Sequence, residues 1–544
     1  MSASSKKKLR NAEKAMQMTE RQQAEQKEAK KLKIFTSVMV AVVVVMVAFA
    51  AYFVTTTAIE NANRGKDERS HIAVSVGEHE LSAAEFNCFF VDAVSNFYSS
   101  YGSYASLFGL DLTKALDQQY YDEAEGITWA DEFITEAQHN AKAVYGVADE
   151  AKANGFTLSD DDKAYIDQQM SMMDTYAALY GYSKTDDYIQ AMYGVGCNEE
   201  ILRNYLTVCR TAQTYQNAVA EGMEFTAADL AAKDAENPAA FSNFTYNTYY
   251  LGVSKFLEGG TEGEDGTKTY SDDEQAAAVA AAEEAAKLAI TGVSNAAQFD
   301  LAIKALPINA EASSAASTAC EDYSYDYINS VVQSWVTNAS RQEGDVTYIA
   351  STSTDEDGKE TVNGYYAVLF GGRNENEMFL QNVRHILVKF QGGTTDDNGN
   401  TTYSDAEKTA AKESAEAILA DWKAGEASEE SFAALANEKS DDGDGTTGGL
   451  YTDIYPGQMV TNFNDWCFDA ARQTGDTGVI ETEYGYHVMY YVGAAEQTYR
   501  NYQIENTLVN EAVESWYNGI VEALTLTVVD MDHVPTGMVL SSGN

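Results

Sequence analysis

The strongest constraint on this chain's fold is an internal repeat in its second half. Landmarks recur in the same order: Tyr270-Ser271-Asp272, Phe299 and Trp335, then Tyr403-Ser404-Asp405, Phe432 and Trp466. The tyrosine and the phenylalanine are 29 residues apart in both copies, while the offset between copies drifts from 134 to 121 along the unit. Ordered self-similarity of this kind indicates one structural unit present twice. The sequence therefore predicts two tandem domains of one fold, at residues 244–373 and 381–494.

Each copy has the pattern of an α+β domain: a strand, an acidic glycine-rich turn, a helix, short helices and a final strand pair. In the second copy we expect a strand at Val383–Phe390 and a helix at Ser404–Lys423, with Gly425 near the helix end as a stop signal. A short helix is expected at Phe463–Ala471 and a closing strand at His487–Val492.

Several kinds of chemistry have no motif in the chain. The acidic turns at Asp355–Gly358 and Asp396–Gly399 lack the full calcium-loop pattern, so we expect ordinary turns there. There is no zinc helix, nucleophile elbow or phosphate loop. A net charge of −48, from 36 Lys+Arg and 84 Asp+Glu, argues against nucleic acid as a partner. We therefore expect no metal and no cofactor.

The N-terminal end has the pattern of a membrane anchor. Residues 1–33 contain ten Lys/Arg and four Glu, and Ile34–Val54 contains no charged residue. A helix of that length spans about 30 Å, which is enough to cross a bilayer core. By the positive-inside rule we expect a cytoplasmic tail (1–33), a single-pass transmembrane helix (34–58) and an extracytoplasmic body at the cell membrane. A cleaved signal peptide is the alternative, but its apolar region runs about 7–15 residues.

The region between the anchor and the repeats is predicted to be helical. A strand at His71–Val76 is followed by Ser82 and Glu85, which form a capping-box pattern, and helical periodicity continues to about Glu224. We assign residues 71–240 to a helical domain, and 495–544 to a C-terminal helix and strand that complete it. Its aromatic and methionine side chains are first of all core; the alternative is an exposed cradle for unfolded polypeptide.

The second copy resembles the parvulin, or PpiC-type, peptidyl-prolyl cis-trans isomerases (rotamases). The resemblance covers about residues 382–493. The matching segments are Val383–Val388, Phe432–Ala436, Ser440–Asp442, Gly448–Leu450, Gly457–Met459, Phe463, Phe468, Gly475 and Thr482–Val488. One departure is Tyr451–Pro456 after Gly449-Leu450, which is one residue longer than the expected spacing.

The resemblance implies a site that rotates X-Pro bonds. Uncatalysed rotation faces a barrier of about 18–20 kcal/mol, but no bond is broken, so neither nucleophile nor cofactor is needed. The implied substrate-binding seat for proline is Leu450, Met459, Phe463 and Phe468. The implied catalytic network is His385, Asp442, Thr482 and His487.

The first copy does not keep this set. Tyr366 stands where His487 falls, Leu251 or Tyr250 stands where His385 falls, and no counterpart of Gly457–Met459 is found. We therefore expect a degenerate parvulin-like domain.

The segments Val74–Gly77, Ser82–Phe86 and Tyr188–Gly194 resemble the helical chaperone domain of PrsA-like and SurA-like foldases. The expected helix Asn501–Leu524 and strand Leu526–Asp530 resemble the C-terminal segment that returns to that domain. Together these patterns predict a membrane-anchored, extracytoplasmic isomerase and chaperone that assists folding of translocated proteins. Its partners would be unfolded polypeptides with X-Pro bonds. The alternative is a binding-only chaperone or scaffold with two inactive repeats; a surface adhesin is a weaker alternative that no motif supports.

Overall fold

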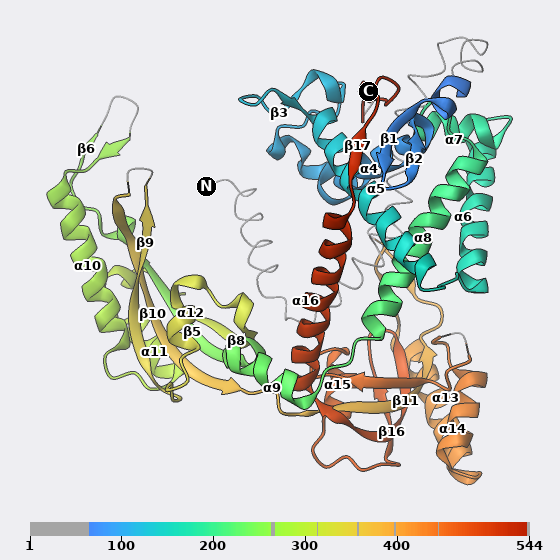
Figure 1. The fold of residues 1–544 in the computed structure, drawn as a ribbon. Coiled ribbons are helices and arrows are strands. Elements are labelled where there is room, and N and C mark those ends of the chain that lie inside the picture. The colour runs from blue at the N-terminus through green and yellow to red at the C-terminus, as the bar shows by residue number, and fades with distance from the viewer. Residues whose placement is uncertain are drawn as a thin grey trace. The chain divides into compact units, whose positions relative to one another are not determined.

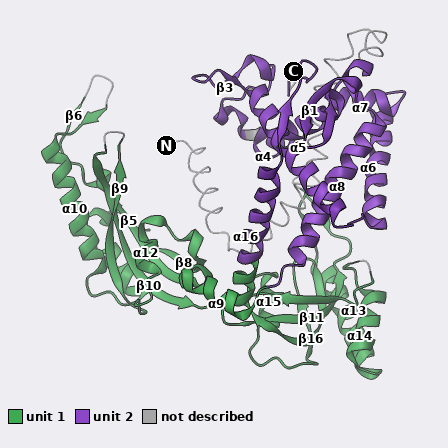
Figure 2. Cartoon of the chain, viewed as in Figure 1, with its two compact units in different colours: residues 1–24, 225–506 green, residues 25–224, 507–544 purple. Residues whose placement is uncertain are grey.

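The computed structural model describes residues 65–540, apart from 263–266, 313, 356–357, 397–398 and 444. The basic tail and the apolar run Ile34–Val54 lie outside these residues. Within the described part, none of the helices has the length and apolar character needed to cross a membrane. The described chain divides into two compact units, one of residues 225–506 and the other of residues 65–224 with 507–540 (Figure 2).

The helical unit begins with a hairpin of β1 (Ile72–Val76) and β2 (His79–Ser82). Its helices are α4 (Ala83–Tyr101), α5 (Trp129–Ala153), α6 (Asp160–Leu179), α7 (Thr185–Tyr193) and α8 (Glu199–Glu221). The predicted capping box is confirmed: Glu85 N–H donates to Ser82 Oγ, and Ser82 N–H donates to the Glu85 carboxylate. The small pair β3 (Tyr120–Asp122) and β4 (Ile127–Thr128) and the 3-10 turns Gly102–Phe108 and Leu116–Gln118 were not predicted, because such short elements carry no periodicity.

The C-terminal segment returns to this unit, as the sequence suggests. Helix α16 (Tyr499–Ala523) is followed by β17 (Leu526–Val528), which pairs antiparallel with β1. Figure 1 shows this red strand beside the blue N-terminal hairpin. Trp516 of α16 donates its indole N–H to Glu150 of α5 at 2.8 Å. The last part of the chain therefore completes the β17-β1-β2 sheet.

The other unit contains two α+β domains with the same topology. The first has the sheet order β8-β5-β10-β9 and the second has β14-β11-β16-β15, and all these pairs are antiparallel. The strands are β5 (Asn243–Gly252), β8 (Thr318–Ser324), β9 (Val346–Thr354) and β10 (Glu360–Asn374), then β11 (Phe379–Lys389), β14 (Leu450–Ile454), β15 (Thr477–Glu481) and β16 (Gly485–Thr498). The predicted duplication of one α+β fold is confirmed.

The helices follow the same plan in both copies, and α9 (Ala227–Glu236) precedes them. The first copy has α10 (Asp272–Ile290), α11 (Ala296–Lys304) and α12 (Ser330–Val336); the second has α13 (Asp405–Ala424), α14 (Glu429–Lys439) and α15 (Thr461–Cys467). Short hairpins precede α10 and α13: β6 (Thr261–Glu262) with β7 (Lys268–Thr269), and β12 (Thr394–Thr395) with β13 (Thr401–Thr402). The remaining 3-10 turns are Pro238–Phe241, Val253–Phe256, Pro307–Asn309 and Tyr325–Tyr327.

Matching side-chain contacts hold the same parts together in each copy. Arg341 lies over the Trp335 ring at 4.9 Å, and Arg472 lies over the Trp466 ring at 4.1 Å. Such cation–π contacts favour one orientation of the loop that follows α12 or α15. Trp335 and Trp466 therefore mark equivalent positions of the two copies, as the repeat predicts.

Strand pairing corrects one sequence-based alignment. Val368 of β10 pairs with Thr248, and Met489, its counterpart in β16, pairs with His385. Thr248 therefore occupies the position of His385, and the prediction of Leu251 or Tyr250 was wrong. The sequence alignment depends on the pair Lys255-Phe256, which lies in the 3-10 turn Val253–Phe256. Lys255 comes three residues after Gly252, which is the residue that pairs as Lys389 does in the second copy.

The second sheet has a separate core on each face. Ile386, Phe432 and Val488 belong to the core on the side of α13 and α14. Val383, Phe463 and Met489 belong to the core on the side of α15. Because side chains alternate along a strand, His385 lies on the same face as Val383, beneath α15.

Candidate active site

Two buried histidines meet on the α15 face of the second sheet. In the central pair of strands His385 is opposite Met489 and His487 is opposite Leu387, which makes the histidines diagonal neighbours. Only 2% of His385 and 5% of His487 is exposed. Their Nδ1 atoms are 3.0 Å apart. At that distance the two rings share one hydrogen bond.

The two histidines are the middle of a longer chain of hydrogen bonds. His385 Nε2 lies 3.2 Å from Asp442 Oδ2, and His487 Nε2 lies 2.9 Å from Thr482 Oγ1. Because an ionised carboxylate can only accept, His385 carries a proton on Nε2. When His385 is neutral, its Nδ1 accepts from His487 Nδ1–H, and His487 Nε2 accepts from the Thr482 hydroxyl. The structure thus brings all four expected network residues into one line.

The negative charge of this hydrogen-bonded chain is located at one end, on Asp442. Burial and the neighbouring His385 lower the pKa of His487 to about 3, so His487 is neutral near pH 7. Hydrogen bonds from His385 and Tyr451 hold the pKa of Asp442 well below its usual range. The negative charge therefore resides on Asp442, whose side chain is 39% exposed.

An apolar cluster lies directly against this network. Phe463 of α15 is 3% exposed, and its ring lies edge-on to both imidazoles, with centroids 5.4 Å away in each case. Met459 and Phe468 are partly buried in the same cluster. Three of the four side chains expected in the apolar seat therefore belong to one cluster, which contacts the histidines through Phe463.

Leu450 does not lie with them. It pairs with Arg384, while the next residue, Tyr451, pairs with Val383 on the His385 face. Arg384 forms an ion pair with Glu429 of α14 at 2.9 Å, which places Leu450 on the opposite, helix-covered face. We correct the expected seat accordingly.

Tyr451 is the site residue that sequence reasoning missed. Its ring centroid lies 4.6 Å from that of His385 and 6.3 Å from that of Phe463. Its hydroxyl donates to Asp442 Oδ2 at 2.7 Å. Tyr451 therefore contacts both the polar network and the apolar cluster.

The segment Tyr451–Pro456, expected to be one residue longer than usual, contains a β-bulge. Between the pairs Val383–Tyr451 and Gln381–Ile454, β14 has one residue more than β11. Asp453 in the bulge has a φ of 54° and donates its N–H to Asn382 Oδ1 at 2.9 Å. The first copy has the same bulge, at Asp322 with a φ of 54°.

The first copy keeps this framework but not the site. Strand and helix registers place Thr248 at the position of His385, Cys320 at Tyr451, Ile328 at Met459, Val332 at Phe463 and Tyr366 at His487. Ile328 is the counterpart of Met459 that the sequence comparison did not find. Tyr366 packs on Tyr250 with ring centroids 4.8 Å apart. No imidazole pair forms at these positions of the first copy.

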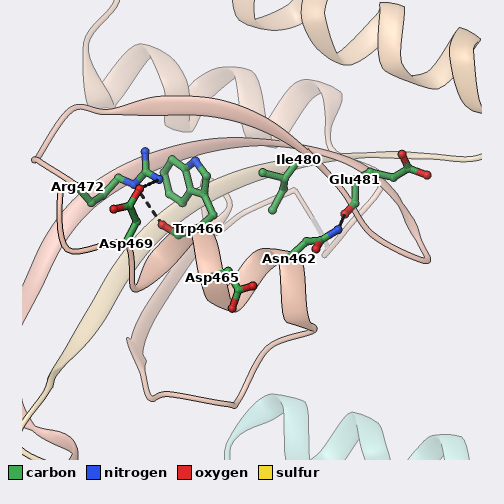
Figure 3. Close-up of a pocket in the computed structure, with 7 residues that line it drawn as sticks. All are labelled: Asn462, Asp465, Trp466, Asp469, Arg472, Ile480 and Glu481. Carbon is green, nitrogen blue, oxygen red and sulfur yellow. Dashed lines mark hydrogen bonds and ion pairs between the residues drawn. The ribbon is translucent and has the colours of Figure 1, made fainter.

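Figure 3 shows an open hollow between α15 and β15. Its lining is Asn462, Asp465, Trp466, Asp469, Arg472, Ile480 and Glu481. The figure also shows Asn462, whose side-chain N–H donates to the Glu481 carbonyl, and Arg472 lying along Trp466. Ile480 is paired with His487, but none of the network residues lines this hollow, so we assign the chemistry to the place where Phe463 meets the histidines.

The low pKa of His487 gives a prediction about stability. Unfolded His487 has an ordinary pKa of 6.5 against about 3 when folded, so the unfolded chain binds more protons between these values. The contribution of His487 to the free energy of unfolding is therefore complete above pH 6.5 and is lost as the pH falls toward 3. We expect urea unfolding at a series of pH values to show a shallower acid loss in His487→Gln. Exposed His139→Gln is the control, and identical slopes for wild type and His487→Gln would contradict the assignment.

Comparison with known proteins identifies the domain. Residues 385–493 match the family model "Rotamase: PPIC-type PPIASE domain". No curated protein sequence matches the chain. A solved structure of peptidylprolyl isomerase PrsA from Bacillus cereus is 24% identical over 30% of this chain, with a TM-score of 0.18. PrsA from Bacillus subtilis is 13% identical over 75% of this chain and 93% of its own, with a TM-score of 0.26. The chain spans only 58% of the Bacillus cereus structure.

Proposed function

We propose that this chain, in which residues 385–493 form a PpiC-type peptidyl-prolyl isomerase domain, acts as an isomerase and chaperone on unfolded polypeptides. The observation that carries the proposal is the buried line from Asp442 through His385 and His487 to Thr482, with Phe463 against both rings. Structural and binding-only domains have no need of two buried imidazoles joined in this way.

The geometry suits rotation about an X-Pro bond. A planar amide is stabilised by charge-separated resonance, which is lost when the bond twists. Apolar surroundings disfavour the more polar planar form relative to the twisted one, and this difference is what lowers a barrier. Phe463 and Met459 supply an apolar wall for the proline ring, and neutral His487 adds no charge to it. Thr482 and the histidines offer hydrogen bonds within a preorganised network.

An assay of X-Pro exchange separates catalysis from binding alone. We expect the full chain to accelerate cis-trans exchange in a proline peptide and the proline-limited refolding of a client protein. Met459→Ala should reduce both rates, because the wall for the proline ring is lost. A chain that binds the unfolded client without changing either rate would favour the binding-only chaperone instead.

The helical unit supports the chaperone part of the proposal. Its predicted aromatic core is largely buried, with Phe89 2% and Phe90 0% exposed. Other apolar side chains are exposed: Tyr104 is 62%, Leu107 79% and Phe108 51% exposed. Exposed apolar groups of this kind are suited to transient contact with unfolded chains. We therefore place client holding on this unit and isomerisation on the second α+β domain.

The topological part of the proposal rests on the sequence. The basic tail (1–33) and the uncharged Ile34–Val54 run would leave the body outside the cytoplasm, where newly translocated chains fold. Protease added to intact cells should therefore remove the body and leave a small anchored fragment. A cytoplasmic marker protein is the control for leakage. A body that stays protected until the cells are lysed would contradict this topology.

A further inference from the structure

Tyr451 occupies a position between the two halves of the site. Its hydroxyl lies on Asp442, at the exposed end of the hydrogen-bonded line, and its ring lies on His385 and near Phe463. The bulge that follows it at Asp453 keeps the rest of β14 in register with β11. Tyr451 is therefore held by backbone pairing as well as by its side chain.

The contact between Tyr451 and Asp442 affects the orientation of the carboxylate. Tyr451 OH and His385 Nε2 both approach Oδ2 of Asp442, at 2.7 and 3.2 Å. Asp442 follows α14 in a loop, and its side chain is 39% exposed, so water competes for its oxygens. A second donor from a strand fixes the direction of the carboxylate. That direction decides which nitrogen of His385 carries the proton.

We propose that Tyr451 is a positioning residue of the isomerase site, whose hydroxyl holds Asp442 so that His385 keeps its proton on Nε2 and turns Nδ1 toward His487. The proposal rests on the proposed isomerase function. Tyr451 acts through Asp442, and its ring forms part of the wall between His385 and Phe463.

The hydroxyl is suited to this role at all ordinary pH values. Burial, and then the bond to Asp442, raise the pKa of Tyr451 well above its usual range. The group therefore remains a donor wherever Asp442 is ionised.

The first copy provides an internal comparison. It has the same strand order and the same bulge, yet Cys320 stands at the position of Tyr451. The folding of β8 thus does not require a tyrosine there. The side chain changes together with those at His385, Phe463 and His487, which is expected of a residue that serves the site rather than the sheet.

The test is Tyr451→Phe in the full chain, which removes the hydroxyl and keeps the ring. We expect kcat for a proline peptide to fall about tenfold with KM changed less than about twofold, because the apolar wall remains. In Asp442→Ala the same substitution should have no further effect, since its target is already absent. Tyr327→Phe, at an exposed tyrosine of the first copy, is the matched control.

A second measurement does not depend on catalysis. The ¹⁵N shifts of His385 should report a proton on Nε2 in the wild type and a mixture of tautomers in Tyr451→Phe. An unchanged kcat, an equal loss in the Asp442→Ala background, or an unchanged His385 tautomer would overturn the proposal. If the wild-type chain shows no isomerase activity, the proposed function fails, and the His385 tautomer alone decides the role of Tyr451.

Discussion

Replacing Met459 with isoleucine and Phe463 with valine should remove most of the isomerase activity while the domain stays folded. These are the side chains that the first copy has at the same places, Ile328 and Val332, and there they pack beneath an equivalent sheet. Valine at position 463 leaves no aromatic edge against His385 and His487, and isoleucine at position 459 replaces a flexible side chain with a branched one. We expect kcat/KM to fall by a factor of about ten to a hundred. This loss is equivalent to about 1.4–3 kcal/mol of transition-state stabilisation.

The reverse exchange supplies the control. Ile328→Met with Val332→Phe in the first copy should leave the activity unchanged, because Thr248 and Tyr366 stand where the histidines would be needed. His487→Tyr, which reproduces Tyr366, should impair catalysis without unfolding the domain. Full activity in the Met459/Phe463 double variant would place catalysis elsewhere in the chain.

Much of the fold could be predicted because its signals are local or repeated. Capping at Ser82, the stop at Gly425 and the 29-residue spacing in both copies depend only on nearby residues or on comparison of the chain with itself. The expected helix at Ser404–Lys423 is present as α13, Asp405–Ala424. The helix expected at Phe463–Ala471 is shorter, because α15 ends at Cys467 and Phe468 turns out of it.

The errors at the site have a different origin, since they depend on pairing between distant strands. Leu450 was placed in the seat by its motif, but antiparallel register sends it to the face of Arg384 and sends Tyr451 to the face of His385. Lys255-Phe256 is likewise displaced by three positions in the turn Val253–Phe256, so the counterpart of His385 is Thr248. A one-residue change in register exchanges the two faces of a sheet, so neither outcome can be read from spacing alone. The hydroxyl bond from Tyr451 to Asp442 depends on that register too.

The second large effect should come from Gly449, which lies beside His385 in the sheet. Its carbonyl accepts the His385 N–H at 2.9 Å, and its φ is +64°, a region that non-glycine residues rarely adopt. A Cβ at this position would lie 2.2 Å from the His385 carbonyl oxygen and 3.0 Å from the Ala436 Cβ. Neither neighbour can move freely, because one is backbone of the central strand and the other lies in the buried face of α14.

Gly449→Ala should therefore lower stability and activity together. The left-handed backbone alone costs about 1–2 kcal/mol in alanine. Separating β14 from β11 adds to this cost and moves Tyr451 away from His385, so the hydrogen-bonded line is lost as well. Gly475→Ala, in the same domain, isolates the backbone cost, because Gly475 has a φ of +91° with nothing within 4 Å of its Cβ position. Urea unfolding and kcat/KM of the two variants should differ clearly, with Gly449→Ala the lower in both. Equal losses in the two variants would mean that the close approach of β14 to His385 does not support the site.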